Sequence, residues 1–394
     1  MTKAKISLLS LFALVAISIV LRPPVAAIGP LLNEISLSLD LVAAQSSALN
    51  AAPVLCFGLG AFLSPWLARK VGLNVAMMIS LAVLFMALVL RLSFGFIGLM
   101  VGTLAAGLSI AVANVLLPTV VRSDFPNRVP LLTGVYTTLL ALSASFAAWA
   151  AVVSSSAFGG WVFALGIWAL PSLLAVLLWI PKLRNREVIT EEKPQTASAE
   201  RRAIMRSPLA WAIVGFFGFQ SLGFYAVLGW MPAILLEAGF SAEQSSNYLG
   251  FTTAIGIPFG LVLSFILSRF KSLAWLAAGA SLVSTSGFVL LFIATTTTPS
   301  LLVLACILLG VGQSSTFPMS LSLIGTKAKT QALTTQLSAM SQGWGYLISA
   351  AGTFALGYLA SITHGWQVSI VVLISISAVQ VLVGFASGGR GRIS

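Results

Sequence analysis

The chain has 394 residues, of which 58% are hydrophobic and only 8% are charged, and its mean hydropathy is +1.04. A soluble domain carries roughly 25% charged residues, so this chain has too few charged side chains to cover two or three soluble domains. We therefore expect an integral membrane protein. Short segments of alternating polarity, which are typical of a membrane β-barrel, are absent from the sequence.

Twelve apolar runs are long enough to cross a bilayer as helices, because about 20 residues suffice. They predict an all-α integral membrane protein with twelve transmembrane helices. The N-terminus resembles a signal peptide, but its apolar run exceeds a usual h-region and Arg22-Pro23-Pro24 interrupts the approach to a cleavage site, so we expect a retained helix. The runs lie at residues 6–28, 46–67, 74–91, 95–120, 131–154, 160–180, 208–235, 244–267, 273–294, 299–325, 331–358 and 365–386.

The net charge of +12 follows the topology and does not indicate a nucleic-acid-binding surface. With both termini on the cytoplasmic side of a bacterial inner membrane, 19 of the 21 basic residues fall in inner segments. Of the other two, Arg91 lies in an outer loop at the end of a helix, and Arg22 lies inside a helix. This is the positive-inside rule. The inner basic residues are Lys3, Lys5, Arg69, Lys70, Arg122, Arg128, Lys182, Arg184, Arg186, Lys193, Arg201, Arg202, Arg206, Arg269, Lys271, Lys327, Lys329, Arg390 and Arg392.

The chain repeats itself at an interval close to half its length. Gln45-Ser46-Ser47 matches Gln244-Ser245-Ser246, and Pro118 matches Pro318, with offsets of 199 and 200. Between the halves, Pro181 to Ser207 holds eleven charged residues in 27. We expect an N-terminal six-helix bundle at 1–180, a cytoplasmic linker loop at 181–207 and a C-terminal six-helix bundle at 208–394. Two such pseudo-symmetric halves describe a transporter that binds its substrate between them.

Several motifs together resemble a known family. The layout resembles the major facilitator superfamily, and the motifs are similar to those of its cyanate and 2-nitroimidazole permease family. The motifs are Leu21-Arg22-Pro23, Asn114-Val115-Leu116-Leu117-Pro118, Arg122-Ser123-Asp124-Phe125-Pro126, Ser207-Pro208-Leu209-Ala210-Trp211, Gly229-Trp230-Met231-Pro232-Ala233 and Met340 through Gly345. The resemblance implies the major facilitator fold, transport of a small solute by alternating access and no enzymatic activity.

The chain departs from the wider superfamily in its usual charged and antiporter motifs. Arg69-Lys70-Val71-Gly72 lacks the acid of the second-helix loop, and Thr103 stands where helix 4 usually carries an Arg before Gly107. The fifth run lacks the Gly–Pro pattern of antiporters. The superfamily's proton-antiport assignments therefore do not transfer to this chain. Glu34 and Glu237, at matching positions of the two halves, are the acids that we consider for proton coupling.

Arg22 is the strongest candidate for substrate binding. An arginine stays protonated, and a charge inside a membrane helix needs a partner, which an anionic substrate would supply. The alternative is that Arg22 reaches the outer headgroups. Pro23 and Pro24 remove two N–H donors and predict a helix break, which either borders a binding cavity or serves packing alone.

The other candidates are uncharged or lie at the inner surface. In the superfamily, helices 1, 4, 7 and 10 line the cavity and 2, 5, 8 and 11 flank it, which favours a set of amides and phenols as substrate contacts; helix–helix hydrogen bonding is the alternative for each. Arg122, Asp124 and Arg128 form either a cytoplasmic gate or simply topogenic charge. The proposed substrate-binding residues are Arg22, Asn114, Tyr136, Gln220, Tyr225, Gln313, Gln336 and Gln342.

The sequence argues against several other functions. It has one histidine, no zinc motif and no ATP-binding loop, so we expect no metal, no cofactor and no enzymatic activity. Cys56 and Cys306 each lie alone in an apolar run, as packing residues do. We expect a monomer in membrane lipid, without nucleic acid, that binds a small solute, with an anion as one candidate. A multidrug exporter is the alternative, although the buried carboxylate that often binds cationic drugs is missing.

Overall fold

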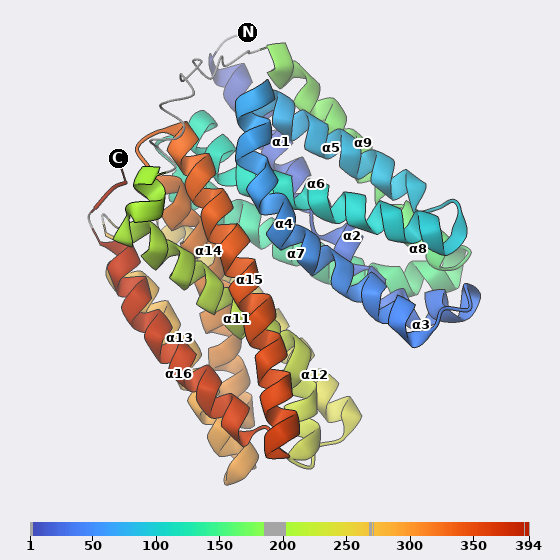
Figure 1. Cartoon of the computed structure of the whole chain (residues 1–394), viewed down its shortest axis with the longest axis vertical. Coiled ribbons are helices and arrows are strands. Elements are labelled where there is room, and N and C mark those ends of the chain that lie inside the picture. The colour runs from blue at the N-terminus through green and yellow to red at the C-terminus, as the bar shows by residue number, and fades with distance from the viewer. Residues whose placement is uncertain (1–2, 185–201, 268–269, 271, 390, 394) are drawn as a thin grey trace. The chain divides into compact units, whose positions relative to one another are not determined.

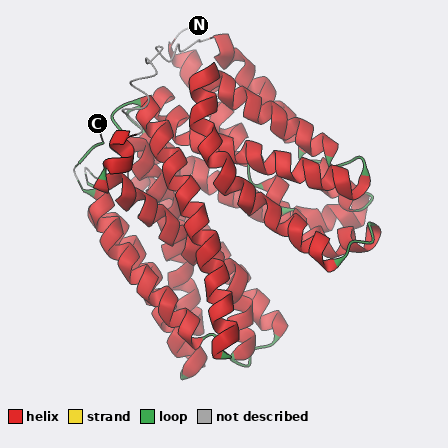
Figure 2. Ribbon diagram, in the orientation of Figure 1, coloured by secondary structure: helices red, strands yellow, loops and turns green. Residues whose placement is uncertain are grey.

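A computed structural model describes residues 3–184, 202–267, 270, 272–389 and 391–393 of the chain. These residues are largely helical (Figures 1 and 2). Among them the structure contains no strand, only an isolated bridge between Ala328 and Ile393. The all-α fold predicted from the apolar runs is confirmed.

The described residues of the first half form nine α-helices and a short 3₁₀ turn. Its first span is divided into three pieces and its sixth into two, whereas the others are continuous. The helices are α1 (Lys3–Val20), α2 (Pro23–Ala26), α3 (Ile28–Ser38), α4 (Ala43–Val71), α5 (Leu73–Leu90), α6 (Gly95–Asp124), α7 (Val129–Phe158), α8 (Trp161–Gly166) and α9 (Ala169–Trp179), followed by the turn η1 (Ile180–Arg184).

The second half has longer, unbroken helices. They are α11 (Pro208–Glu237), α12 (Ala242–Leu267), α13 (Ala274–Thr296), the turn η2 (Pro299–Leu301), α14 (Leu302–Lys327), α15 (Gln331–Thr363) and α16 (Gln367–Gly388). Ten helical segments of the described chain are long and apolar enough to cross a membrane. The other two predicted spans fall in α4 and α12, which at 29 and 26 residues also have the necessary length.

The chain divides into two compact units. One holds Met1–Asn127 and Tyr136–Ala199, and the other holds Arg128–Val135 and Glu200–Ser394. The division in sequence thus runs through the start of α7 as well as through the linker, most of which (185–201) lies outside the described residues.

Each unit packs its helices in the same pattern. In the first, α6 contacts α4 and α5, and α9 contacts α1 and α5; in the second, α14 contacts α12 and α13, and α16 contacts α11 and α13. The predicted repeat also shows at the hydrogen-bond level. Gln45 accepts the N–H of Val42 at 3.0 Å, and Gln244 accepts the N–H of Ser241 at 3.0 Å. The structure therefore confirms two pseudo-symmetric halves.

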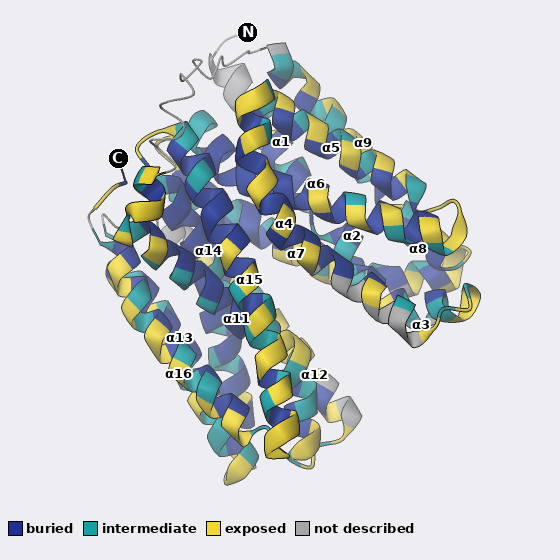
Figure 3. Cartoon of the chain, in the orientation of Figure 1, coloured by how far each residue is buried: buried dark blue, intermediate teal, exposed yellow. Residues whose placement is uncertain are grey.

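The helices of each bundle have buried and exposed faces (Figure 3). Small and apolar residues predominate among the buried positions, and many large apolar residues are exposed. Cys56 and Cys306 are buried and free. In contrast, Trp275 is 77% exposed and Phe354 75%. A soluble monomer rarely exposes such contiguous apolar surface.

Candidate functional site

The first span is interrupted at Arg22. Helix α1 ends at Val20, and Pro23 and Pro24 occupy the first two positions of α2. Proline fits the first turn of a helix but cannot continue one from the preceding turn, since it has no N–H and its ring clashes there. The Arg22 carbonyl accepts hydrogen bonds from the N–H of Val25 (3.1 Å) and of Ala26 (3.0 Å). The break thus places a half-buried arginine at the junction of two helices.

Arg91 contacts this break, and the sequence analysis missed its role. It follows the last residue of α5 and is only 1% exposed, although the charge pattern predicted an outer helix end. Its Nη1 donates to the carbonyl oxygen of Pro24 at 2.7 Å. The sequence did contain one indication of this role, because Arg91 directly follows an apolar run of 18 residues. Nothing in the sequence connected Arg91 with Pro24.

The other two candidates of the first unit are buried. Asn114 on α6 is 8% exposed, and Tyr136 on α7 is 1% exposed. Both lie in the interior of long helices rather than at their ends. Their positions therefore allow either a substrate contact or a contact between helices.

The amides of the second unit mostly donate to nearby hydroxyls. Gln220 Nε2 donates to Ser221 Oγ at 2.6 Å, and Gln342 Nε2 donates to Ser338 Oγ one turn earlier on α15 at 2.9 Å. Gln336 is half-buried on the same helix. Both bonds lie within a single helix, so they are neither substrate contacts nor the bonds between helices that the alternative predicts.

Gln313 is the amide with an open acceptor. Its Nε2 donates to Ser284 Oγ of α13 at 3.0 Å, while its buried Oε1 has no hydrogen-bond partner among the described residues. It packs on Gly223 of α11, where an added Cβ would lie 2.7 Å from Nε2. Tyr225, two residues further along α11, is half-buried and packs edge-on against Phe224. Gln313 and the part of α11 that holds Gly223 are thus brought together.

At the C-terminal end of α6, Asp124 pairs with a lysine outside the predicted gate. Its Oδ2 accepts from Lys182 Nζ of η1, which also lies 4.2 Å above the ring of Trp179. Of the two arginines assigned to the gate, Arg122 is half-buried and Arg128 is exposed. The ion pair therefore connects α6 with the end of the sixth span in the same unit.

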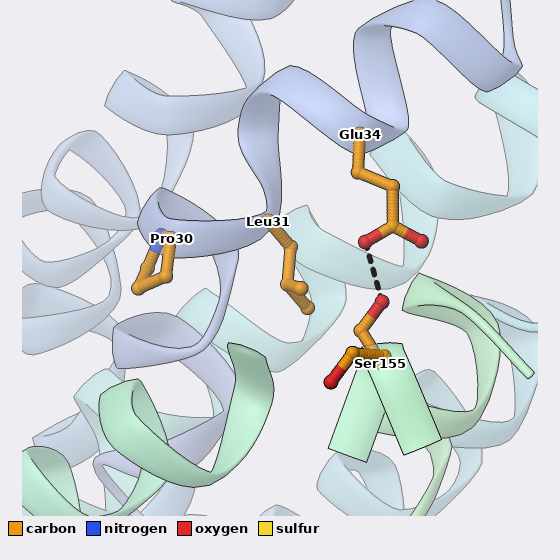
Figure 4. A pocket seen from close by; sticks show the side chains of 5 residues that line it. Pro30, Leu31, Glu34 and Ser155 are labelled. Atoms are coloured by element: carbon orange, nitrogen blue, oxygen red, sulfur yellow. Dashed lines mark hydrogen bonds between the residues drawn. The ribbon is translucent and has the colours of Figure 1, made fainter. Parts of the chain in front are cut away.

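On α3, near the start of α8, Glu34 occupies a shallow cavity (Figure 4). Its Oε1 accepts the backbone N–H of Trp161 at 2.8 Å, and its Oε2 accepts the hydroxyl of Ser155. The cavity has a volume of about 290 Å³ and is lined by Pro30, Leu31, Glu34, Ser155 and Ser156. Because both carboxylate oxygens already hold donors, Glu34 serves as the cap of α8.

The chain belongs to the major facilitator superfamily. The model of that family matches residues 6–353. Among solved structures, the chain is similar to the proton:xylose symporter XylE, with a TM-score of 0.78 at 13% identity over 97% of this chain and 95% of that one. The similarity in fold agrees with the twelve-helix architecture predicted from the sequence.

Within the superfamily, the chain is similar to three transporters. The chain is 31% identical to the uncharacterized transporter YycB of Bacillus subtilis (strain 168), over 94% of this chain and 90% of that protein. It is 31% identical to the 2-nitroimidazole transporter of Escherichia coli (strain K12), over 94% and 93%. It is 28% identical to the cyanate transport protein CynX of the same organism, over 90% and 91%. The predicted resemblance is confirmed: this is a multi-pass membrane protein and a secondary transporter, not an enzyme.

Proposed function

We propose that this chain carries a small polar solute, of the cyanate-like anion or nitroimidazole-like class, across the bacterial inner membrane by alternating access. The observation that carries the proposal is Arg22 at the interrupted first span. Among the described residues, the acids lie in loops or near helix ends and none lies within the interior of a candidate span. A cation at that depth suits an anionic or electron-rich solute as its partner.

The buried amides and phenols support a small solute with few polar atoms. Each amide offers N–H donors and a carbonyl acceptor, each phenol offers one O–H that donates and accepts, and Gln313 keeps a buried acceptor that a solute N–H would satisfy. Asn114, Tyr136, Gln220, Tyr225, Gln336 and Gln342 complete the proposed contacts, and Arg122, Asp124 and Arg128 remain the proposed cytoplasmic gate. The protein acts as a monomer surrounded by lipid, without a cofactor.

Flux into proteoliposomes tests the proposal. Purified protein should accelerate uptake of cyanate or of 2-nitroimidazole at least tenfold over empty vesicles, with and without an imposed pH gradient. Transport of bulky lipophilic cations, with no uptake of either small solute, would instead identify a multidrug exporter.

The orientation is tested separately. Both termini and the 181–207 loop are proposed to face the cytoplasm, because basic residues concentrate there. Reporter fusions near Ala197 and at Ser394, which lie outside the described residues, should be active only as cytoplasmic reporters. A reporter active in the periplasm at either place contradicts the topology.

A further inference from the structure

Arg91 is a cation buried without a counter-ion. None of the ion pairs formed by the described residues involves it. Its Nε and Nη2 are also buried and have no hydrogen-bond partner among those residues. Removing a guanidinium from water is costly, and a single carbonyl contact restores only part of the lost hydration. A buried charge of this kind is more often retained for a specific arrangement than for stability.

The single partner of Arg91 lies in the helix break. Pro24 belongs to α2, a helix of four residues that begins directly after Arg22. A helix this short has little stability of its own. The charge-assisted bond from Nη1 therefore ties α2 to the end of α5 and limits the movement of the segment that carries Arg22.

A glycine makes room for this contact. An added Cβ at Gly102 of α6 would lie 2.7 Å from Arg91 Cγ and 2.7 Å from the Ala87 carbonyl oxygen. The backbone of α6 thus packs directly on the arginine stem. A side chain at this position would displace Arg91 without changing any charge.

Among its described residues, the second unit lacks both features. Its first span, α11, is continuous from Pro208 to Glu237, and the residues that end α13, the counterpart of α5, are threonines. In the part of the chain that the structure describes, the buried arginine and the broken helix thus occur together in the first unit only.

We propose that Arg91 is a positioning residue: it holds the Pro24 carbonyl and thereby fixes the helix break that presents Arg22 to the transported solute. The part of this proposal that concerns the solute rests on the proposed function above. The part that concerns the break does not, since a physical measurement on the protein without solute tests it.

Hydrogen–deuterium exchange of the purified full-length protein is the first test. In Arg91→Met, which keeps most of the side-chain volume, amides of residues 25–28 should exchange at least fivefold faster than in the wild type. Peptides from α11 serve as the internal control and should be unchanged. Exchange at the break that stays within twofold of the wild type overturns the proposal, whether or not any solute is transported.

The conservative variant separates a positioning role from direct solute binding. Arg91 uses only one donor on one carbonyl, so Arg91→Lys should restore exchange and uptake to within about threefold of the wild type. If Arg91 bound the solute through its Nε–Nη2 edge, lysine would fail as a replacement. Uptake by Arg91→Lys as low as by Arg91→Met, together with normal exchange at the break, therefore contradicts a positioning role.

A double-mutant cycle tests whether Arg91 acts through Arg22. Arg91→Met should lower uptake tenfold in the wild type but less than twofold when Arg22→Lys is already present. Equal losses in both backgrounds would show that the two arginines act independently, which overturns the proposal.

Gly102→Ala displaces Arg91 by a second route, and it carries the test if Arg91→Met does not insert. It should reproduce the faster exchange at residues 25–28. Gly279→Ala is the matched control, because an added Cβ there has no neighbour within 4 Å. Equal exchange rates at the break in these two variants would contradict the proposal. If uptake is absent even in the wild type, the proposed function fails while the exchange data still decide the role of Arg91.

Discussion

The two units begin with apolar spans that differ in one respect: the first is broken and the second is continuous. Aligning Pro30 with Pro232 places Arg22, Pro23 and Pro24 opposite Phe224, Tyr225 and Ala226. Pro232 lies inside α11 without ending it, and Pro118 does the same in α6. One proline is absorbed by a long packed helix, whereas two consecutive prolines end one. The two units thus share the same order of spans, and the Arg22-Pro23-Pro24 segment breaks the first span of only one of them.

One contact at the end of the first span recurs in both units. Glu34 accepts the N–H of Trp161 at 2.8 Å, and Glu237 accepts the N–H of Trp366 at 3.0 Å. In each unit, a glycine precedes the tryptophan, and an added Cβ there would lie 3.1 or 3.2 Å from the carboxylate oxygen. A carboxylate at a helix N-terminus is stabilised by the free N–H groups there. The two acids considered for proton coupling are therefore helix caps.

The contacts at the C-terminal ends of α6 and α14 differ in chemistry. In the first unit, Asp124 at the end of α6 binds Lys182 after α9. In the second, Lys327 at the end of α14 donates to the carbonyls of Gly388 and Gly389, where α16 ends. Both contacts join the fourth span of a unit to its sixth, but the lysine belongs to the sixth span in the first unit and to the fourth span in the second. Because different residue types make the two contacts, a comparison of the two half-sequences does not identify them.

The largest expected effect comes from removing the charge at the break. Arg22→Ala should insert normally and lose at least tenfold in uptake, and Arg22→Lys should also be impaired because lysine lacks the planar fork of donors. Uptake by each variant at matched expression measures this. The exposed Arg69→Ala is the control for loss of an arginine. Wild-type uptake by Arg22→Ala would remove Arg22 from the binding site.

The duplicated caps should contribute unequally to stability. Glu34→Gln weakens two hydrogen bonds of a half-buried carboxylate, so it should lower the free energy of unfolding by about 1–2 kcal/mol. Glu237→Gln should have a smaller effect, because Glu237 is exposed and makes one such bond. Thermal unfolding in detergent compares the two variants.

The same variants decide whether the acids couple transport to protons. If both are caps, the double variant Glu34→Gln/Glu237→Gln should respond to an imposed pH gradient as the wild type does, once the amount of folded protein is matched. Selective loss of pH-driven accumulation in the double variant would restore them as coupling residues.

The Asp124–Lys182 contact should affect transport rate modestly. Its side chains are only 9% and 17% exposed, so Asp124→Asn or Lys182→Met leaves the remaining group without its buried partner and should lower the free energy of unfolding by about 3 kcal/mol, but at matched folded protein each should change uptake by no more than about fivefold. Because the two side chains bind each other, the double variant should be no worse than the more affected single variant. Losses that multiply would assign a second partner, such as Arg122 or Arg128, to Asp124.

The helices of the fold could be predicted from the sequence because a membrane helix must satisfy its backbone internally and present about 20 apolar residues. The repeat could be predicted because matching residues recur at offsets of 199 and 200. The contacts at the site could not be predicted: the bond from Arg91 to Pro24 joins residues 67 positions apart, and the Asp124–Lys182 pair spans 58. No local sequence pattern around one partner indicates the other. In the same way, nothing in the sequence indicated that Glu34 accepts the N–H of Trp161.

The smallest expected effect distinguishes two glutamines of the second unit. The Gln342 amide donates to Ser338 of its own helix, and losing this local bond in Gln342→Leu should change the free energy of unfolding by less than about 0.5 kcal/mol. Gln313 bonds across to Ser284 of α13, so Gln313→Leu should cost about 1 kcal/mol. If both side chains also contact the solute, uptake should fall two- to fivefold in each variant, out of proportion to stability. Uptake that follows folded protein alone in Gln342→Leu would leave that residue as a packing contact and confine the second unit's contribution to the neighbourhood of Gln313.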